Sequence, residues 1–337
     1  MIMNIGFYLP YCNERGTIVA TYDYAYNNER VLGNKSYIIH KSDIDISCKE
    51  MYNIIERDLE IIKYKNNEEL NEKIKKNNIS HLYYLIHGRE TLDKFKDIDV
   101  KLCIHCVFRY KNSKYYHRCA SISPIVKCNN YSNPYVEHIN DLPRYKHNED
   151  LRDLLEIPKE ALVIGRYGGY DTFNIDYVKK CIIDHVNKRN DIYFIFLNTY
   201  NFCKGKCGTE TIFIHRGIKR KNNNKTIFLR GTYSKPEDKI RFINTCDMMI
   251  HGKLAGETFG LSVAEFSSMN KPIITSRNGS KWHIIKLGEK GIVKDSYEEL
   301  MEYFVNLDKS KLVGDWQCYK DCNSESIMLK FRKEFLE

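Results

Sequence analysis

Residues 246–276 read CDMMIHGKLAGETFGLSVAEFSSMNKPIITS, and this stretch decides the fold class. Its apolar beginning predicts a strand that ends at Ile250, and the glycines that follow predict a loop. The next apolar and small residues predict a helix from Ser262 to Met269, and a second strand is expected from Pro272 to Thr275. A strand, a loop, a helix and a second strand in this order predict a parallel sheet with crossover helices.

The same alternation of strands and helices continues on both sides of this stretch. Strands are expected over residues 5–9, 37–40, 81–87, 100–107 and 120–126 in the N-terminal half, and over 161–165, 192–197, 226–229, 247–250 and 272–275 in the C-terminal half. Helices are expected up to Val31 and over residues 49–62, 68–77, 175–186, 236–245, 262–269 and 298–306. Each half is therefore predicted to be a doubly wound α/β domain, in which ligands bind beyond the carboxyl ends of the strands.

The length of the chain and one proline-containing segment predict where the domains divide. A chain of 337 residues is long enough for two ordinary domains. Residues 134–158 are polar and contain prolines, which predicts a linker between the two halves. We therefore expect an N-terminal domain over residues 1–147, a C-terminal domain over 148–315 and a final helix over 316–337.

The composition of the chain indicates which kinds of partner and which cellular compartment to expect. The formal net charge is +9, but the basic residues are interleaved with 44 acidic ones, so a nucleic-acid partner is not expected. Twelve cysteines are scattered through the chain and no secretory signal precedes them, which predicts reduced thiols in a cytoplasmic protein. No apolar run approaches the roughly 20 residues that span a bilayer, so membrane contact is expected to be peripheral at most.

Cysteine spacing leaves zinc as an alternative to free thiols. The spacings are Cys103-x-x-Cys106, Cys203-x3-Cys207 and Cys318-x3-Cys322. The first pair lies within a predicted strand, and no second pair follows it at the spacing of a zinc ribbon. We therefore predict no metal site.

Two glutamates carry the functional prediction. Glu257 lies in the glycine-rich loop and Glu265 in the helix that follows, with seven residues between them. A glycine-rich loop that leads into a helix directs backbone N–H groups and the positive end of the helix dipole toward a diphosphate. Glu257 is then placed to reach the hydroxyls of a sugar, and Glu265 to accept hydrogen bonds from a ribose. Alternatively, Ser262 to Glu265 match a capping box, in which Glu265 only satisfies the start of the helix.

This stretch resembles the retaining GT-B glycosyltransferases of family 4, which carry two glutamates so spaced around a Gly-Phe-Gly-Leu-like loop. Here the loop reads Thr258-Phe259-Gly260-Leu261, with Thr258 in place of the usual first glycine. The resemblance implies two facing Rossmann-like domains, a donor cleft between them and a final helix that returns to the N-terminal domain. It implies transfer of a hexose, with retention, from a UDP- or GDP-linked sugar to a glycan, lipid or protein acceptor.

The resemblance also assigns two cations. Arg166 follows the strand at residues 162–165, where the family has an arginine that contacts the donor phosphates. The lysine that usually follows it is missing, and Lys253 is the candidate for the second positive charge. With these cations on the leaving group, no divalent metal and no other cofactor should be required. A surface salt bridge is the alternative explanation of Arg166.

Two residues of the N-terminal half complete the predicted site. His105 lies in the strand at residues 100–107, and family members often carry a histidine near the end of the equivalent strand, facing the donor sugar. A histidine between Cys103 and Cys106 is otherwise a core residue. Gly16 matches the position where a family glycine lets the backbone approach the donor, although glycine is also common in such loops for conformational reasons.

The prediction is therefore a metal-independent glycosyltransferase. Its predicted catalytic residues are Glu257, His105, Arg166 and Lys253, and its predicted donor-binding residues are Gly16, Arg166, Lys253, Glu257, Thr258, Phe259, Gly260, Leu261 and Glu265. A catalytically silent relative that binds sugars or nucleotides, or acts as a scaffold, remains an alternative because of Thr258 and the missing lysine. A nucleic-acid binder is a second alternative, for which no motif is present.

Overall fold

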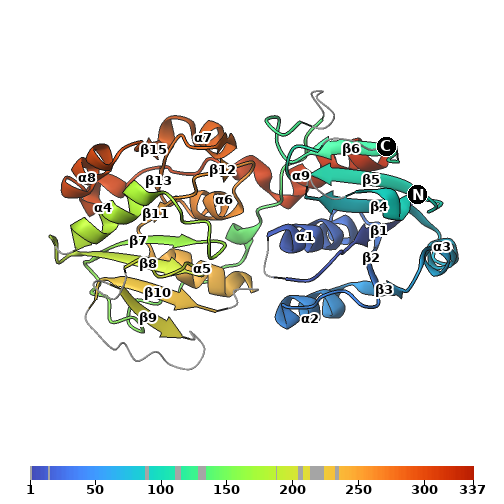
Figure 1. Ribbon diagram of the computed structural model, residues 1–337, viewed down its shortest axis with the longest axis horizontal. Helices are drawn as coiled ribbons and strands as arrows, with labels where there is room; N and C mark the ends of the chain where they lie inside the picture. Colours follow the sequence, from blue (N-terminus) through green and yellow to red (C-terminus); the bar gives the residue numbers. More distant parts are fainter. Residues whose placement is uncertain are drawn as a thin grey trace. The chain divides into compact units, whose positions relative to one another are not determined.

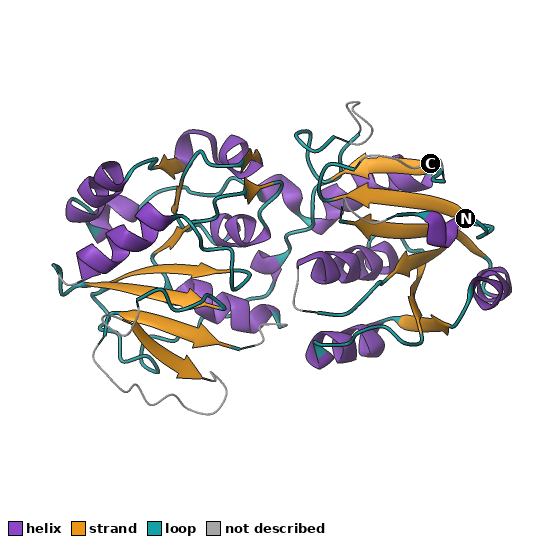
Figure 2. Cartoon of the chain, in the orientation of Figure 1, coloured by secondary structure: helices purple, strands orange, loops and turns teal. Residues whose placement is uncertain are grey.

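The computed structural model describes residues 2–13, 16–87, 91–110, 115–127, 134–186, 188–203, 208–212, 224–231 and 235–337, with the backbone alone for 208–212. The chain forms two compact units, one of residues 1–139 and 321–337 and the other of residues 140–320. Each unit is built on a parallel sheet with helices (Figures 1 and 2).

The N-terminal unit contains a six-stranded parallel sheet in the order β3-β2-β1-β4-β5-β6. Its strands are β1 (Asn4–Tyr8), β2 (Lys35–Lys41), β3 (Glu60–Tyr64), β4 (Ile79–Ile86), β5 (Lys101–Cys106) and β6 (Arg118–Ser121), and its first helices are α1 (Gly16–Arg30), α2 (Lys49–Asp58) and α3 (Asn67–Lys76). The chain passes from β1 outward to β3 and then returns to β4 on the other side of β1. The carboxyl ends of β1 and β4 therefore form the switch point where such sheets bind ligands.

The C-terminal segment of the chain packs on this first sheet. Helix α9 (Ser324–Phe331) begins at Asn323, whose side chain accepts a hydrogen bond from the backbone N–H of Ser326. The ring of Phe331 lies 6.2 Å from that of Phe7 and 5.3 Å from that of Tyr24. The expected helix over 316–337 is thus α-helical only from Ser324 to Phe331, followed by a π-helical turn at Arg332–Leu336.

The C-terminal unit contains a seven-stranded parallel sheet in the order β15-β13-β11-β7-β8-β10-β9. Its strands are β7 (Leu162–Tyr167), β8 (Ile192–Leu197), β9 (Gly208–Ile212), β10 (Thr226–Arg230), β11 (Met248–Ile250), β13 (Ile273–Thr275) and β15 (Gly291–Val293). Its helices are α4 (Asp176–Val186), α5 (Pro236–Thr245), α6 (Leu261–Ser268), α7 (Trp282–Leu287) and α8 (Tyr297–Val305). A separate ladder pairs β12 (Gly256–Glu257) with β14 (Ser280–Lys281).

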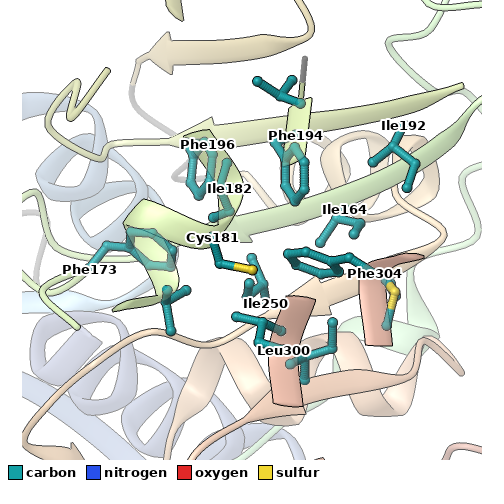
Figure 3. Packing of buried hydrophobic residues seen from close by; sticks show 14 of the residues in the cluster. Ile164, Phe173, Cys181, Ile182, Ile192, Phe194, Phe196, Ile250, Leu300 and Phe304 are labelled. Carbon is teal, nitrogen blue, oxygen red and sulfur yellow. The ribbon is translucent and has the colours of Figure 1, made fainter. Parts of the chain in front are cut away.

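The core of the C-terminal unit is centred on β8, in which all six residues are buried. A continuously apolar strand is typical of a sheet covered by helices on both faces. Figure 3 shows Phe194 and Phe196 of β8 with Phe304 of α8 and Phe173 of the loop before α4. The rings of Phe194 and Phe304 are 5.5 Å apart, and those of Phe173 and Phe196 are 5.1 Å apart. This packing fixes the strand whose carboxyl end borders the site.

The structure differs from the expected elements in a few places. The helix expected over residues 49–62 ends at Asp58, and Leu59 is extended, so that Glu60–Tyr64 form the edge strand β3. The strand expected over 120–126 is shorter and earlier, at Arg118–Ser121. Strands β9 and β15 and helix α7 were not expected, because each is short and carries little periodicity of its own.

Candidate functional site

The glycine-rich loop has a backbone that two glycines make possible. Gly256 adopts a φ of +62°, and a Cβ atom there would lie 2.1 Å from the carbonyl oxygen of Ser280. Gly260 adopts a φ of +85° and is the N-cap residue of α6. Left-handed backbone and close approach both favour glycine at these positions. The pairing of β12 with β14 then holds Glu257 in place.

The start of α6 contradicts the capping box. The helix begins at Leu261, Gly260 provides no side-chain cap, and Ser262 is already the second helical residue. Glu265 is therefore the fifth residue of the helix and does not cap it. Phe259 is 1% exposed and packs edge-on against Tyr319, whose hydroxyl donates a hydrogen bond to the carbonyl oxygen of Phe259 at 3.3 Å. The side chain of Phe259 therefore does not face a ligand at this loop.

Glu257 is held by two nitrogen groups from its own loop. The Nζ of Lys253 lies 2.9 Å from Oε2, and the Nε2 of His251 lies 3.4 Å from Oε1. Burial acts to raise the pKa of Glu257, but the hydrogen bond with His251 and the charge of Lys253 outweigh it and lower the pKa to about 2. Glu257 is therefore a carboxylate at any physiological pH.

Arg166 is buried at the end of β7, being 5% exposed. Its guanidinium donates hydrogen bonds to the hydroxyls of Thr172 and Thr199 and, at 3.3 Å, to the carbonyl oxygen of Gly169. Burial lowers its pKa to about 10, although the charges of Glu257 and Asp171 act to raise it. Within the described part of the chain no carboxylate forms a salt bridge with Arg166, which contradicts the surface salt bridge. Among the described residues, Arg166 is therefore a buried cation without a paired anion.

Glu265 is buried and paired with two side chains from other elements. Its Oε1 lies 2.6 Å from the Nζ of Lys239 in α5, and its Oε2 accepts a hydrogen bond from the hydroxyl of Tyr167 at the end of β7. Burial, together with the charge of Glu265, raises the pKa of Tyr167 well above its ordinary value, so this phenol remains a donor. Tyr167 and Lys239 were not predicted from the sequence. Tyr167 follows Arg166 at a strand end, which is a usable signal, whereas nothing in the helix pattern marks Lys239.

The structure brings together the predicted site residues that belong to the C-terminal unit. Arg166 and Tyr167 end β7, Lys253 and Glu257 lie in the loop after β11, and Glu265 lies in α6. Because β7 and β11 are parallel neighbours, their carboxyl ends meet at one edge of the sheet. The site therefore combines two cations, two carboxylates and the N-terminus of a helix.

His105 does not reach any surface. It is fully buried in β5, its Nδ1 is 2.7 Å from the hydroxyl of Tyr83, and the rings of Tyr24, His138 and Phe335 surround it. Burial lowers its pKa to about 3. This environment supports the core explanation, and we leave His105 out of the site. Gly16 is the exposed first residue of α1, and its contact with a donor stays a prediction.

A different histidine lies at the switch point of the N-terminal sheet. His87 follows β4, and its Nε2 is hydrogen-bonded to the hydroxyl of Tyr11 and lies 3.2 Å from that of Thr17 in α1. Tyr11 follows β1, so this polar group occupies the carboxyl ends of β1 and β4. His87 was not predicted from the sequence, although a polar residue that ends an apolar strand is a signal for this position.

Comparison with known proteins identifies the fold. The protein resembles HepE of Anabaena, in a complex with UDP and glucose, at a TM-score of 0.63 and 12% identity, covering 99% of this chain and 95% of that one. A glycosyltransferase from Rickettsia africae matches at a TM-score of 0.63 and 14% identity, with 99% and 94% coverage. This chain has the GT-B fold. A Listeria monocytogenes protein described as a UDP-N-acetylglucosamine 2-epimerase also matches, at a TM-score of 0.60 and 11% identity, with 100% and 97% coverage.

Residues 207–310 match the model of the family Glycosyl transferases group 1. The match includes Lys253, Glu257 and Glu265 but not Arg166, and it supports the glycosyltransferase class. No curated protein matches the chain in sequence. Among the helices that the structure describes, none combines the length and the hydrophobicity of a membrane span.

Proposed function

We propose that this protein is a glycosyltransferase that binds a UDP- or GDP-linked sugar at the carboxyl edge of its second sheet. The observation that carries the proposal is the meeting of the buried cation Arg166 with the Lys253–Glu257 pair beside the N-terminus of α6. An unpaired buried guanidinium is costly unless an anion binds to it. A diphosphate is an anion of the right chemistry for this place.

Each side chain has a separate role in this proposal. Arg166 and Lys253 neutralise the diphosphate, together with the backbone amides at the start of α6. Glu257 accepts hydrogen bonds from the sugar, and Glu265 accepts them from the ribose diol. Tyr167 holds the carboxylate of Glu265 in one orientation, and Lys239 balances its charge. The polar group of His87, Tyr11 and Thr17 is the proposed acceptor side.

The proposed reaction breaks the bond between the anomeric carbon and the diphosphate oxygen and forms one to an acceptor hydroxyl, whose proton leaves with the diphosphate. Positive charge develops on the sugar and negative charge on the leaving group, and preorganised charges lower this barrier. We propose that the acceptor attacks from the face of the leaving group, so that the anomeric configuration is retained. The two cations make a divalent metal unnecessary.

The test is a panel of nucleotide sugars with two readouts, thermal stabilisation and release of the nucleoside diphosphate. A ligand at about 100 times its dissociation constant adds about 2.7 kcal/mol of stability. We expect stabilisation by UDP or GDP and by one cognate sugar donor, with diphosphate released from that donor. Failure of every nucleoside diphosphate to stabilise the protein would overturn the proposal.

A catalytically silent nucleotide-sugar binder is the second candidate. Two features of the sequence favour it: Thr258 stands in place of a glycine, and the loop directly after Arg166 contains no lysine. Both remove features that the transferases share. The GT-B fold does not decide between them, since a protein described as an epimerase shares it. Binding of a donor without any hydrolysis or transfer, with acceptors supplied, would favour the silent binder.

A further inference from the structure

Three buried residues lie behind Glu257 and form a row of side chains. His251 is 5% exposed, Thr275 is 1% exposed and His283 is fully buried. The hydroxyl of Thr275 lies 3.1 Å from Nδ1 of His251 and 2.9 Å from Nε2 of His283. The opposite nitrogen of His251, Nε2, lies 3.4 Å from Oε1 of Glu257. A continuous hydrogen-bonded row therefore leads from His283 to the carboxylate.

The sheet builds this row. His251 follows β11 directly, Thr275 ends the neighbouring strand β13, and the backbone N–H of His251 donates to the carbonyl oxygen of Ile274 at 2.8 Å. His283 is the second residue of α7, and its ring centroid lies 4.6 Å from that of His251. Since strand pairing and helix packing fix all three backbones, the side chains have little freedom to leave the row.

Hydrogen-bond chemistry determines which nitrogen of His251 carries a proton. The carboxylate of Glu257 is an acceptor only, so the nitrogen that faces it must be an N–H. The hydroxyl of Thr275 has one proton and donates to one imidazole while it accepts from the other. If His251 is neutral, Thr275 donates to its Nδ1 and His283 donates to Thr275. If His251 is protonated, the hydroxyl turns and donates to Nε2 of His283, whose proton then lies on Nδ1. In both states the Nε2–H of His251 points to Glu257.

We propose that His251, Thr275 and His283 are positioning residues that hold the carboxylate of Glu257 in one orientation, whatever the charge of His251. Their effect on turnover rests on the proposed transferase function, whereas the hydrogen-bonded row itself does not. The charged groups that face this row are Glu257 and Lys253 of the same loop, with Arg166 from β7 acting on Glu257.

The test uses Thr275→Val, which removes the hydroxyl at nearly constant volume, with Thr275→Ser as the matched control that keeps it. Nitrogen-15 NMR of the histidines in the ligand-free protein reports the protonated nitrogen directly. We expect His251 to carry its proton on Nε2, Thr275→Val to shift the signals of both His251 and His283, and Thr275→Ser to restore them. A neutral His251 with the proton on Nδ1, or unchanged signals in Thr275→Val, would show that the three side chains are not hydrogen-bonded as proposed.

Turnover tests the positioning role on the same variants. Losing one hydrogen bond in a chain that ends on a charged group should lower the turnover of the donor by about tenfold in Thr275→Val. The affinity for UDP should stay unchanged, since UDP lacks the transferred sugar that Glu257 is proposed to bind, and Thr275→Ser should retain most of the turnover. His283→Phe removes both buried ring nitrogens, and His283→Gln, which can both donate and accept a hydrogen bond, serves as its control. Full turnover in Thr275→Val would refute the positioning role. Absence of nucleotide binding in the wild type would instead refute the proposed function, and the NMR result would still test the hydrogen bonds among His251, Thr275 and His283.

Discussion

Arg166→Met tests two effects of the buried cation separately: the stability that its burial costs the fold, and the affinity that its charge contributes to binding of an anion. Methionine keeps much of the length of the side chain but removes the charge and its donors. The wild-type guanidinium is 5% exposed and is bonded to two hydroxyls and one carbonyl oxygen, all neutral. We therefore expect the substitution to change binding far more than stability.

The magnitudes follow from the environment of Arg166. Burial lowers its pKa from 12.5 to about 10, and one pKa unit corresponds to about 1.36 kcal/mol. The charge therefore destabilises the ligand-free fold by about 3 kcal/mol, while its neutral hydrogen bonds each contribute about 1 kcal/mol. Because these contributions nearly cancel, the unfolding free energy of Arg166→Met should lie within about 1 kcal/mol of the wild type. Loss of charge-assisted bonds to phosphate should raise the dissociation constant of UDP by about 10- to 100-fold.

The assay pairs urea denaturation with calorimetric titration of UDP on the same preparations. Arg152→Met is the matched control, because Arg152 is also buried but pairs with Asp247 at 2.8 Å. That control should lose about 3 kcal/mol of stability or more, because it removes the buried ion pair with Asp247 and the hydrogen bonds of Arg152 to the carbonyl oxygens of Pro158, Lys159 and Ala161, and it should bind UDP normally. The reasoning would be refuted if Arg166→Met lost more than about 3 kcal/mol of stability and bound UDP as tightly as the wild type.

The remaining predictions concern the two glutamates, metals and pH. Glu257→Gln should depress donor turnover strongly while UDP affinity stays nearly intact. Equal losses of turnover and UDP affinity would refute the contact of Glu257 with the donor sugar. Glu265→Gln should weaken the binding of UDP and of the full donor together, as measured by calorimetry. Normal UDP binding would refute the contact of Glu265 with the ribose. Activity should survive excess EDTA, and a complete loss restored by manganese would contradict metal independence. The pKa of Glu257 is lowered from 4.5 to about 2, so its stabilisation is complete above pH 4.5 and is lost as the pH falls toward 2. Urea titrations between pH 6 and pH 3 should therefore show a smaller loss of stability in Glu257→Gln than in the wild type.

Local sequence patterns predicted the elements that support the site. The apolar run at residues 192–197 is β8, and the helix that starts at Pro236, a residue suited to the first turn, ends at Thr245 as expected. The glycines after Ile250 predicted a loop between strand and helix, and Gly256 and Gly260 adopt positive φ angles in that loop. These features are encoded within a few residues of each other, which is why a single sequence reveals them.

Long-range partners could not be predicted in the same way. Tyr167 and Glu265 are 98 residues apart, and only the assembled sheet brings them together. The capping box failed because Gly260 takes the N-cap position that the motif assigns to Ser262. His105 was predicted from the family resemblance and His87 was missed, because one sequence does not say which histidine of an apolar strand the core will enclose. Edge strand β3 was hidden because it follows α2 after a single residue.

Hydrogen exchange measured by mass spectrometry, with and without saturating UDP, tests the central claim most directly. The claim is that a nucleoside diphosphate binds at the carboxyl ends of β7 and β11 and the N-terminus of α6. We predict slower exchange in peptides covering residues 166–172 and 251–266 when UDP is bound. Binding of UDP with no protection in these two segments, or with protection confined to the N-terminal unit, would contradict the proposed site.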